Sequence, residues 1–524
     1  MATDPDPVVT TAQGAVRGLR EDGVLSFRSI PYAAPPRGRA RFEPPRAHAP
    51  WEGVRDATEP GPTAPQAPRT LGTMDMSPYF GDGWHRGEDH LTVNVWTPEP
   101  ATDQAAAPAT GPATGPATDP GDADGLPVMV FVHGGGFVAG STRAPLYDGS
   151  AFARDGVVLV TLNYRLGIAG FLDLPGAPAN RGLLDVVAAL RWVRENIAAF
   201  GGDPHRVTLF GQSAGATLVG GVLATPGASG LVRRAIVQSG SGLGAFTREQ
   251  AARVTQAAAG ALGIAPRAEA FAEISDERLV DAASHLAGID LRTATHTDPL
   301  VGLSPFSLVL DTQPADSVAA GSAAGVDLLV GTTTEEGNLY LVPTGASATT
   351  TPEDVEATAA RTHPDPARLV AAYRTARPHA SPAALRAALL GDALFGAGTW
   401  ALATAHAGRP GGPGGPGRSA TYAYEFAWRS GALDGALGAT HTMELAFVFD
   451  TAHLPALRGP RALLGPTEPP AGLAARVHAT WARFARTGAP GWDPYDTERR
   501  ATMRIDAEWA QADDPRARER RAWG

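Results

Sequence analysis

The segment GQSAG at 211–215 places a serine in the pattern G-x-S-x-G. The run RVTLF before it is typical of a strand, and the run that starts at Ala214 is typical of a helix. A serine on such a strand–turn–helix connection has a strained backbone, and its hydroxyl projects from the end of the strand. The pattern therefore predicts Ser213 as a nucleophile for acyl transfer, against the alternative of an ordinary Gly-Ser turn.

A second motif, HGGGF at 133–137, follows the apolar run VMVFV. Successive glycines leave backbone N–H groups free to point at a ligand. We expect the N–H groups of Gly135, Gly136 and Ala214 to form an oxyanion hole. The alternative is a flexible glycine turn. His133 stands at the end of the strand beside the predicted hole, which favours a scaffold role over that of a catalytic base.

A nucleophilic serine needs a base and a carboxylate that orients the base. In α/β-hydrolases these residues follow in the order serine, acid, histidine. The run VDLLVGTTTEEGNLY reads as a strand with Glu335 and Glu336 in the turn after it. We choose Glu336 as the acid and keep Glu335 as the alternative, because the pattern does not resolve an offset of one residue.

His441 is the preferred base, because it lies in a loop ahead of an apolar run, from which an imidazole can reach a serine at the end of a sheet. His453 is the competitor. His478 lies in a helical run and is expected to be structural. Three other histidines occur in polar stretches rich in Ala and Pro and are expected to be solvated: His363, His379 and His406.

These residues must be positioned by an alternation of strands and helices. Continuous apolar runs occur at 156–167, 206–216, 232–240 and 326–337, and helical periodicity occurs at 180–202. Continuous rather than alternating apolar runs predict strands buried on both faces, as in a parallel sheet covered by helices. The predicted fold class is α/β, with the 524 residues in one large domain that carries helical insertions.

Two segments are of low complexity. Residues 101–125 repeat GPAT and predict a long, mobile surface loop that joins two paired strands, 91–98 and 126–136. Residues 408–418, with the sequence GRPGGPGGPGR, predict a second flexible surface loop ahead of the strand-like segment 421–428.

Composition excludes several kinds of chemistry. The chain has no cysteine and no lysine, which excludes thiol nucleophiles, Cys-ligated zinc, iron–sulfur clusters, Schiff bases and a Walker-A loop. A net charge of -10 gives no indication of binding to nucleic acid or to an anionic membrane, both of which attract basic surfaces. We see no signal peptide at the start and no apolar run of about 18 residues or more. We therefore expect a cytoplasmic protein, a secreted one being the less favoured alternative.

Taken together, the motifs give the chain a family resemblance. It resembles the type-B carboxylesterases, in the para-nitrobenzyl-esterase-like branch of the cholinesterase family, which belongs to the α/β-hydrolase superfamily. The matching segments run nearly end to end: 30–45, 51–66, 87–98, 133–141, 162–173, 200–216, 331–340, 441–449 and 492–506. The resemblance implies a large, mostly parallel central sheet with helices on both faces and helical insertions over the active site.

The same resemblance implies a catalytic triad of Ser213, Glu336 and His441, and it favours Glu336 over Glu335. It also implies an oxyanion hole of Gly135, Gly136 and Ala214, with no metal or organic cofactor. Four positions depart from the family pattern and leave the triad untouched: His90 in place of a disulfide cysteine, Ser29 for Gly, Gln212 for Glu and Val186 for Gln. The last three can alter the polarity of the pocket.

The predicted function is that of a serine carboxylesterase, a carboxylic ester hydrolase acting on small or medium organic esters through an acyl-enzyme. One alternative is another acyl hydrolase on the same triad, such as a lactonase, carbamate hydrolase or amidase. The other is a non-catalytic cholinesterase-like binding protein, which the presence of all three triad residues disfavours. The expected partner is a small-molecule ester, with no nucleic acid and no membrane, and monomer and homodimer are both compatible with the sequence.

Overall fold

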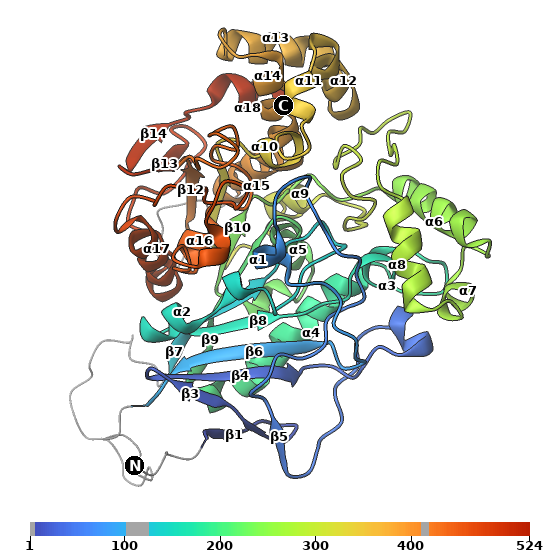
Figure 1. Ribbon diagram of the computed structural model, residues 1–524, viewed down its shortest axis with the longest axis vertical. Helices are drawn as coiled ribbons and strands as arrows, with labels where there is room; N and C mark the ends of the chain where they lie inside the picture. The colour runs from blue at the N-terminus through green and yellow to red at the C-terminus, as the bar shows by residue number, and fades with distance from the viewer. Residues whose placement is uncertain (1–5, 101–124, 410–418) are drawn as a thin grey trace.

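The computed structural model describes residues 6–100, 125–409 and 419–524. The predicted loop at 101–125, apart from Gly125, and the predicted loop at 408–418, apart from its first two residues, lie outside these ranges. The described residues form a central sheet of eleven strands (Figure 1). In spatial order these are β14 (Ala510–Asp513), β13 (Ala501–Ile505), β12 (Thr421–Phe426), β11 (Asp327–Thr333), β10 (Arg234–Gln238), β9 (Gly202–Gln212), β7 (Leu126–Val132), β8 (Val158–Leu162), β6 (Thr92–Pro98), β4 (Val24–Pro31) and β3 (Leu19–Glu21).

The middle of this sheet is parallel. Strands β8, β7, β9, β10, β11, β12 and β13 run in one direction, and antiparallel strands extend the sheet at both edges. Strands β8, β10 and β11 are buried along their whole length. The prediction of an α/β fold with strands buried on both faces is therefore confirmed.

The predicted pairing of the strands on either side of residues 101–125 is wrong. Strand β8 lies between β6 and β7, so that Val93 of β6 faces Leu162 of β8, while Val132 of β7 faces Leu162 from the other side. A short turn forces two strands to pair, but a long connection leaves each of them free to find another neighbour.

The two faces of the sheet form separate cores. In β7, Val128, Val130 and Val132 belong to one hydrophobic cluster, and Met129 and Phe131 belong to the other, as the alternation of side chains along a strand requires. The first cluster lies under α3 (Gly167–Phe171), α4 (Arg181–Asn196), α5 (Ala214–Ala224) and α6 (Arg248–Leu262). The second lies under α2 (Ser150–Arg154), α16 (Leu445–Val448) and α17 (Leu473–Thr487).

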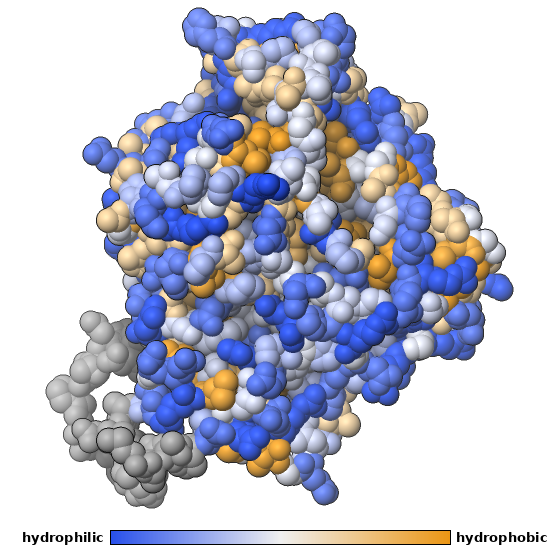
Figure 2. All heavy atoms as spheres, viewed as in Figure 1, coloured by the Kyte–Doolittle hydropathy of each residue, from blue (hydrophilic) through white to orange (hydrophobic). Residues whose placement is uncertain are grey.

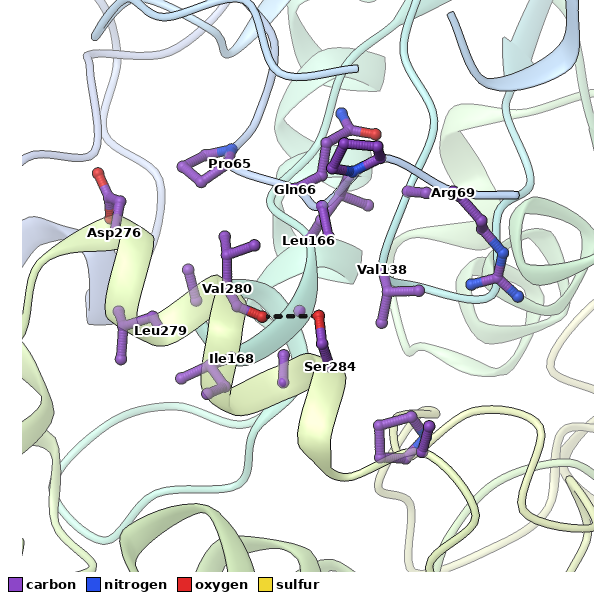
Figure 3. A pocket seen from close by; sticks show the side chains of 18 of the residues that line it. Pro65, Gln66, Arg69, Val138, Leu166, Ile168, Asp276, Leu279, Val280 and Ser284 are labelled. Carbon is purple, nitrogen blue, oxygen red and sulfur yellow. Dashed lines mark hydrogen bonds between the residues drawn. The ribbon is translucent and has the colours of Figure 1, made fainter. Parts of the chain in front are cut away.

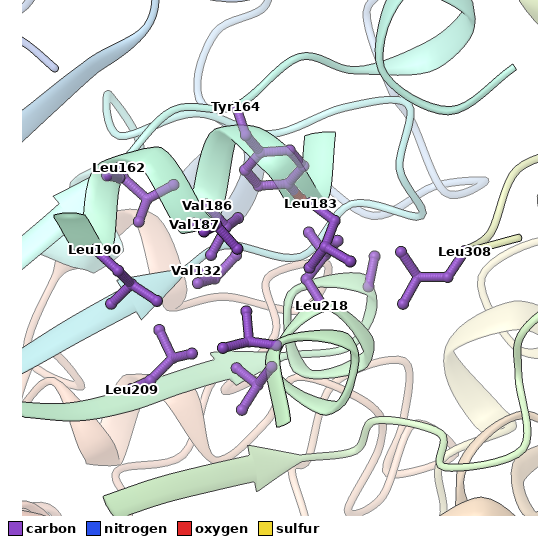
Figure 4. Close-up of a cluster of buried hydrophobic side chains, with 14 of the residues drawn as sticks. Val132, Leu162, Tyr164, Leu183, Val186, Val187, Leu190, Leu209, Leu218 and Leu308 are labelled. Carbon is purple, nitrogen blue, oxygen red and sulfur yellow. The ribbon is translucent and has the colours of Figure 1, made fainter. Parts of the chain in front are cut away.

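Helix α4 shows how the first core is built. Its residues Leu183, Val186, Val187 and Leu190 recur at helical spacing and are all buried. Figure 4 shows these side chains extending from α4 toward Val132 and Leu209 of the sheet and toward Leu218 of α5. This packing holds α5, and with it the turn that precedes α5, against the sheet.

The helical insertions follow β10 and β11. The first holds α6, α7 (Ala268–Ala272), α8 (Asp276–His285) and α9 (Pro314–Ala319). The second holds α10 (Asn338–Leu341), α11 (Ala346–Thr349), α12 (Pro352–Thr362), α13 (Pro366–Ala376), α14 (Pro382–Gly391) and α15 (Ala397–Gly408). Figure 1 shows α11–α14 at the top of the molecule beside the C-terminal α18 (Ala517–Trp523), and α6–α8 along its right side. A short helix α1 (Ser77–Phe80) and a small sheet of β1 (Val8–Thr10), β2 (Ala15–Arg17) and β5 (Val54–Asp56) complete the described elements.

Helix α14, the π-helical turn Asp392–Gly396 and helix α15 form one continuous helical run, Pro382–Gly408, which is long and apolar enough to cross a membrane. Its apolar stretch is 72% buried inside the structure, as in the core helix of a folded protein. Figure 2 shows apolar surface gathered in the upper middle of the visible face, below α11–α14, while hydrophilic residues cover most of the rest.

Two histidines expected to be solvated are buried. His406 on α15 contacts Thr421 Oγ1 at 2.7 Å and Val326 O at 3.0 Å, and burial lowers its pKa to about 3. His363 is buried as well, whereas His379 is exposed as predicted. The polar character of the neighbouring sequence misled the prediction, because the packing of α15 against the sheet decides the burial of His406.

Candidate active site

The turn at Ser213 has the predicted strand–turn–helix geometry. Strand β9 ends at Gln212, α5 begins at Ala214, and Ser213 between them has φ 58° and ψ -125°. A left-handed φ at a non-glycine residue costs about 1–3 kcal/mol and is concentrated at functional sites. A side chain at Gly215 would place its Cβ 2.0 Å from the carbonyl oxygen of Val132, so only glycine allows the turn to lie this close to β7.

The glycine loop after β7 lines the same cavity as Ser213. Gly135 has φ 118° and Gly136 has φ 63°, both in the region that favours glycine. In the described part of the chain no acceptor takes the N–H of Gly135, Gly136 or Ala214. Ala214 is the first residue of α5, where an N–H has no partner in the preceding turn. These three donors are therefore available to a ligand in the cavity.

A buried histidine–carboxylate pair reaches this cavity from another part of the sheet. Glu336 lies in the turn after β11, and His441 lies in the loop after β12. His441 Nδ1 and Glu336 Oε2 are 2.5 Å apart. Glu336 Oε1 accepts hydrogen bonds from Ser239 Oγ at 2.6 Å and from the Thr333 N–H at 2.7 Å. Three donors thus hold the carboxylate in place, and the pair with Nδ1–H leaves the lone pair of His441 on Nε2.

The alternative residues lie elsewhere. The carboxylate of Glu335 accepts a hydrogen bond from the Ala439 N–H at 2.9 Å and forms an ion pair with Arg429. His453 is on the rim of a different pocket, with its Nδ1 3.2 Å from Asp450 O.

His133 does not line the cavity of Ser213. Its ring stacks on Tyr164 with the centroids 4.5 Å apart, and its Nδ1 is 2.8 Å from the carbonyl oxygen of Gly134. Burial lowers the pKa of His133 to about 4, so the imidazole is neutral near pH 7. This arrangement braces the glycine loop and agrees with a scaffold role.

Two contacts of His441 were not anticipated from sequence. Its Nε2 lies 3.2 Å from the side-chain nitrogen of Gln212, which donates to the lone pair of Nε2. Its ring stacks on Phe395, with centroids 4.2 Å apart and planes 10° apart. Phe395 belongs to the π-helical turn Asp392–Gly396 between α14 and α15, and no motif marks it. The position of Gln212 beside the serine was visible in the motif, but its contact with the imidazole was not.

The cavity is mostly apolar apart from these groups. Aromatic side chains from several elements line it: Tyr79, Phe80, Phe137, Tyr147, Tyr340 and Phe395. Among residues 6–100, 125–409 and 419–524, no group of three or more His, Asp or Glu side chains is placed to hold a metal ion. The arrangement offers a hydroxyl, an imidazole with its lone pair on Nε2 and three N–H donors in a mostly apolar cavity, which are the elements of acyl transfer.

Comparison with known proteins supports the same class of chemistry. Residues 5–523 match the model of the carboxylesterase family. The chain belongs to the carboxylesterase family. It is 35% identical to the para-nitrobenzyl esterase of Bacillus subtilis (strain 168), over 98% of this chain and 97% of that one. It is 34% identical to the phenmedipham hydrolase of Pseudarthrobacter oxydans, over 93% and 91%. A crystal structure of a Geobacillus stearothermophilus carboxylesterase superposes with a TM-score of 0.80 at 33% identity, covering 99% of this chain and 100% of the other.

The four departures from the family pattern have distinct settings in this carboxylesterase. His90 is buried, and burial lowers its pKa to about 4. Ser29 has φ 58°, which explains why glycine is usual there. Val186 belongs to the hydrophobic core. Neither Ser29 nor Val186 lines the cavity, so Gln212 is the one departure that changes its polarity.

A second buried carboxyl group lies behind the site. Glu444 Oε1 accepts a hydrogen bond from Gln238 Nε2 at 3.2 Å, and Glu444 Oε2 has no partner among the described residues. Burial, and then the nearby charge of Glu336, raise the pKa of Glu444 from its ordinary 4.5 to about 8. The raised pKa favours the neutral form of the Glu444 carboxyl group at pH values where an exposed glutamate is ionised.

Replacing Glu444 by glutamine is expected to remove a pH dependence of stability. Between pH about 4.5 and 8 the folded chain holds this proton and the unfolded chain does not, so the free energy of unfolding falls as pH rises, by up to about 1.4 kcal/mol per unit. In urea unfolding at pH 5, 6.5 and 8, the free energy of unfolding of the Glu444→Gln chain should increase relative to that of the wild type at each rise in pH. A constant difference between the two chains would contradict a neutral Glu444.

Proposed function

We propose that this carboxylesterase hydrolyses small or medium organic esters through an acyl-enzyme, with Ser213 as nucleophile, His441 as base and Glu336 as the orienting acid. The observation that carries the proposal is the 2.5 Å pair of His441 Nδ1 and Glu336 Oε2, whose imidazole lines the same cavity as Ser213. The strained backbone of Ser213 supports it, since strain of this kind is retained where a side chain must be presented.

The reaction proceeds in two steps. His441 Nε2 takes the hydroxyl proton as Ser213 Oγ attacks the ester carbonyl, and it then gives that proton to the leaving alcohol. Water attacks the acyl-enzyme by the same route and releases the acid and free Ser213. For the first proton transfer, Ser213 Oγ–H must replace the Gln212 amide as the donor to Nε2. Glu336 holds the tautomer and stabilises the imidazolium that forms.

Charge on the carbonyl oxygen is held by the oxyanion hole. We assign this role to the N–H groups of Gly135, Gly136 and Ala214, because these residues line the cavity and their N–H groups have no acceptor in the described chain. Each such donor is worth about 10²–10³ in rate in comparable enzymes. Because the donors belong to the backbone, glycine-loop geometry rather than a side chain supplies this part of catalysis.

The proposal extends to the organisation of the chain. Strands from both ends of the sequence, β3 and β14, form the two edges of one sheet, which supports a single domain over residues 1–524. A cytoplasmic location and a monomeric or homodimeric state stay predictions from the sequence. Measuring kcat/KM for lactone, carbamate and amide substrates, each compared with an ester of equal size, would rank the alternative acyl-hydrolase activities.

Covalent labelling tests the nucleophile directly. A fluorophosphonate should modify one serine with loss of esterase activity, and peptide mapping should place the label on Ser213. Ser241 and Ser239 are internal controls. Ser241 lines the cavity without a left-handed φ, whereas Ser239 has φ 50° but donates its hydroxyl to Glu336 and does not line the cavity. A label on Ser239 or Ser241, or an active enzyme after complete labelling of Ser213, would contradict the proposal.

A further inference from the structure

Arg69 lies in the wall of the proposed active-site cavity. A Cβ atom placed on Gly136 would be 3.3 Å from both terminal nitrogens of Arg69, so the guanidinium is immediately beside the proposed oxyanion hole. One of these nitrogens, Nη1, is 3.4 Å from the carbonyl oxygen of Gly135. The guanidinium also lies 5.8 Å from the centre of the Phe80 ring.

The half-buried Arg69 has few partners for its charge. The fully buried arginines of the described chain, by contrast, each have either a carboxylate or several oxygen acceptors. Arg165 forms paired bonds with Asp185, Arg41 pairs with Asp276, and Arg181 donates to four carbonyl oxygens. Within residues 6–100, 125–409 and 419–524, Arg69 has one long contact to a carbonyl oxygen and no carboxylate within ion-pair distance.

Burial lowers the pKa of Arg69, and Tyr340 is the one described group that acts to raise it. The Tyr340 hydroxyl is itself neutral, since burial raises its pKa well above the ordinary value. A guanidinium remains charged at neutral pH despite such a shift. The cavity therefore holds a cation that is partly removed from water and lacks a counter-ion among the described residues, which is unfavourable unless a ligand supplies one.

The neighbouring cavity does not supply that counter-ion. It has a volume of about 180 Å³ and shares Arg69 and Leu303 with the cavity of Ser213. Figure 3 shows Val138 between the guanidinium of Arg69 and the apolar side chains of Ile168 and Val280. Its carboxylate, Asp276, already pairs with Arg41 at 2.5 Å. We therefore expect the N–H groups of Arg69 that have no acceptor to bind a ligand in the cavity that contains Ser213.

From these observations, and resting on the proposed function, we propose that Arg69 recognises a carboxylate carried by the substrate. The substrate class is then an ester that keeps a free carboxylate close to the scissile carbonyl, such as a half-ester of a short dicarboxylic acid. Guanidinium and carboxylate match in planar, bidentate geometry, which gives both affinity and orientation. The apolar cavity beyond Val138 leaves room for an uncharged part of the same molecule.

A matched pair of substrates tests this proposal. The 4-nitrophenyl half-ester of glutaric acid and the 4-nitrophenyl methyl diester of glutaric acid share the leaving group and the chain, and at pH 7 they differ by one charge. We expect the wild type to prefer the anionic half-ester at least tenfold in kcat/KM. In Arg69→Gln this preference should disappear through a loss of about 10- to 100-fold on the half-ester, the worth of a hydrogen bond to a charged group, while the diester changes less than about threefold.

Two further variants isolate the role of Arg69. Arg69→Lys keeps the charge without the planar fork and should retain part of the preference. Arg86→Gln removes an exposed arginine whose ion pair with Glu277 lies on the surface, and it should leave both substrates unchanged. Since the one hydrogen bond of Arg69 is long, Arg69→Gln should keep the wild-type melting temperature; if it does not, the wild-type preference and Arg69→Lys still decide the question.

The outcomes separate this proposal from the proposed function. A wild type that cleaves the diester readily but shows no preference for the half-ester would overturn the role of Arg69 and leave the esterase proposal intact. Equal losses on both substrates in Arg69→Gln would assign Arg69 to the oxyanion or to folding and would also overturn carboxylate recognition. Failure of the wild type to cleave either ester would instead count against the proposed function.

Discussion

Replacement of Ser213 by alanine is expected to lower kcat for 4-nitrophenyl acetate on the order of 10⁶-fold, the loss that follows removal of the nucleophile in a comparable serine hydrolase. The physical reason is that Ser213 is held on the strained turn between β9 and α5 and lines the same cavity as the imidazole of His441 and the glycines Gly135 and Gly136. Residual turnover should come from the oxyanion hole acting on attack by water.

Ser241→Ala is the matched control for this loss. Ser241 lines the same cavity, and its hydroxyl accepts a hydrogen bond from the Leu243 N–H at 3.2 Å, so it faces the local backbone rather than the imidazole. Its replacement should change kcat by a few-fold at most. A Ser213→Ala enzyme that stays within tenfold of the wild type, freshly purified and free of contaminating esterase, would refute the nucleophile assignment.

Glu336→Gln is expected to lower kcat by about 10⁴-fold, as the loss of the orienting carboxylate does in other triads. An amide presents an N–H group to His441 as readily as an oxygen, so the imidazole is no longer held with its lone pair on Nε2. The same change weakens the acceptor for Ser239 Oγ and the Thr333 N–H, which now position the side chain at 2.6 and 2.7 Å. Steady-state kinetics between pH 6 and 9 would measure the loss.

Glu335→Gln is the adjacent control and should keep activity within a few-fold. Its carboxylate binds the Ala439 N–H and Arg429, so the change weakens a contact of the loop that leads to His441 without removing the partner of Nδ1. Comparable losses in the two variants would show that the turn as a whole, rather than Glu336, is required. A larger loss in Glu335→Gln would assign the acid to Glu335.

The fold was predictable where local pattern and burial agree. The runs that became β8, β10 and β11 are short, apolar and β-branched, and such runs are stable only when both faces are covered. The pairing of β6 with β8 was not predictable, because the intervening chain is too long to impose a neighbour. The burial of His406 escaped prediction for a related reason, since its partners Thr421 and Val326 come from other elements.

The candidate site divides in the same way. The sequence by itself determined the turn of Ser213 and the glycine loop. Both depend on steric limits on a few neighbouring residues: the glycines at 211 and 215 around the serine, and three successive glycines after a strand. The sequence also excluded a thiol or a lysine amine as the nucleophile, because the chain contains no cysteine and no lysine.

Only the tertiary structure decided how these parts meet. Glu336 and His441 lie 105 residues apart and come within 2.5 Å because β11 and β12 are neighbours whose carboxyl ends share one edge of the sheet. The insertion between those strands brings Phe395 against the imidazole, and the chain before β6 brings Arg69 beside Gly136, one of the proposed oxyanion donors. Contacts of this kind depend on the sum of many weak packing energies over the whole core, and no short segment of sequence carries that sum.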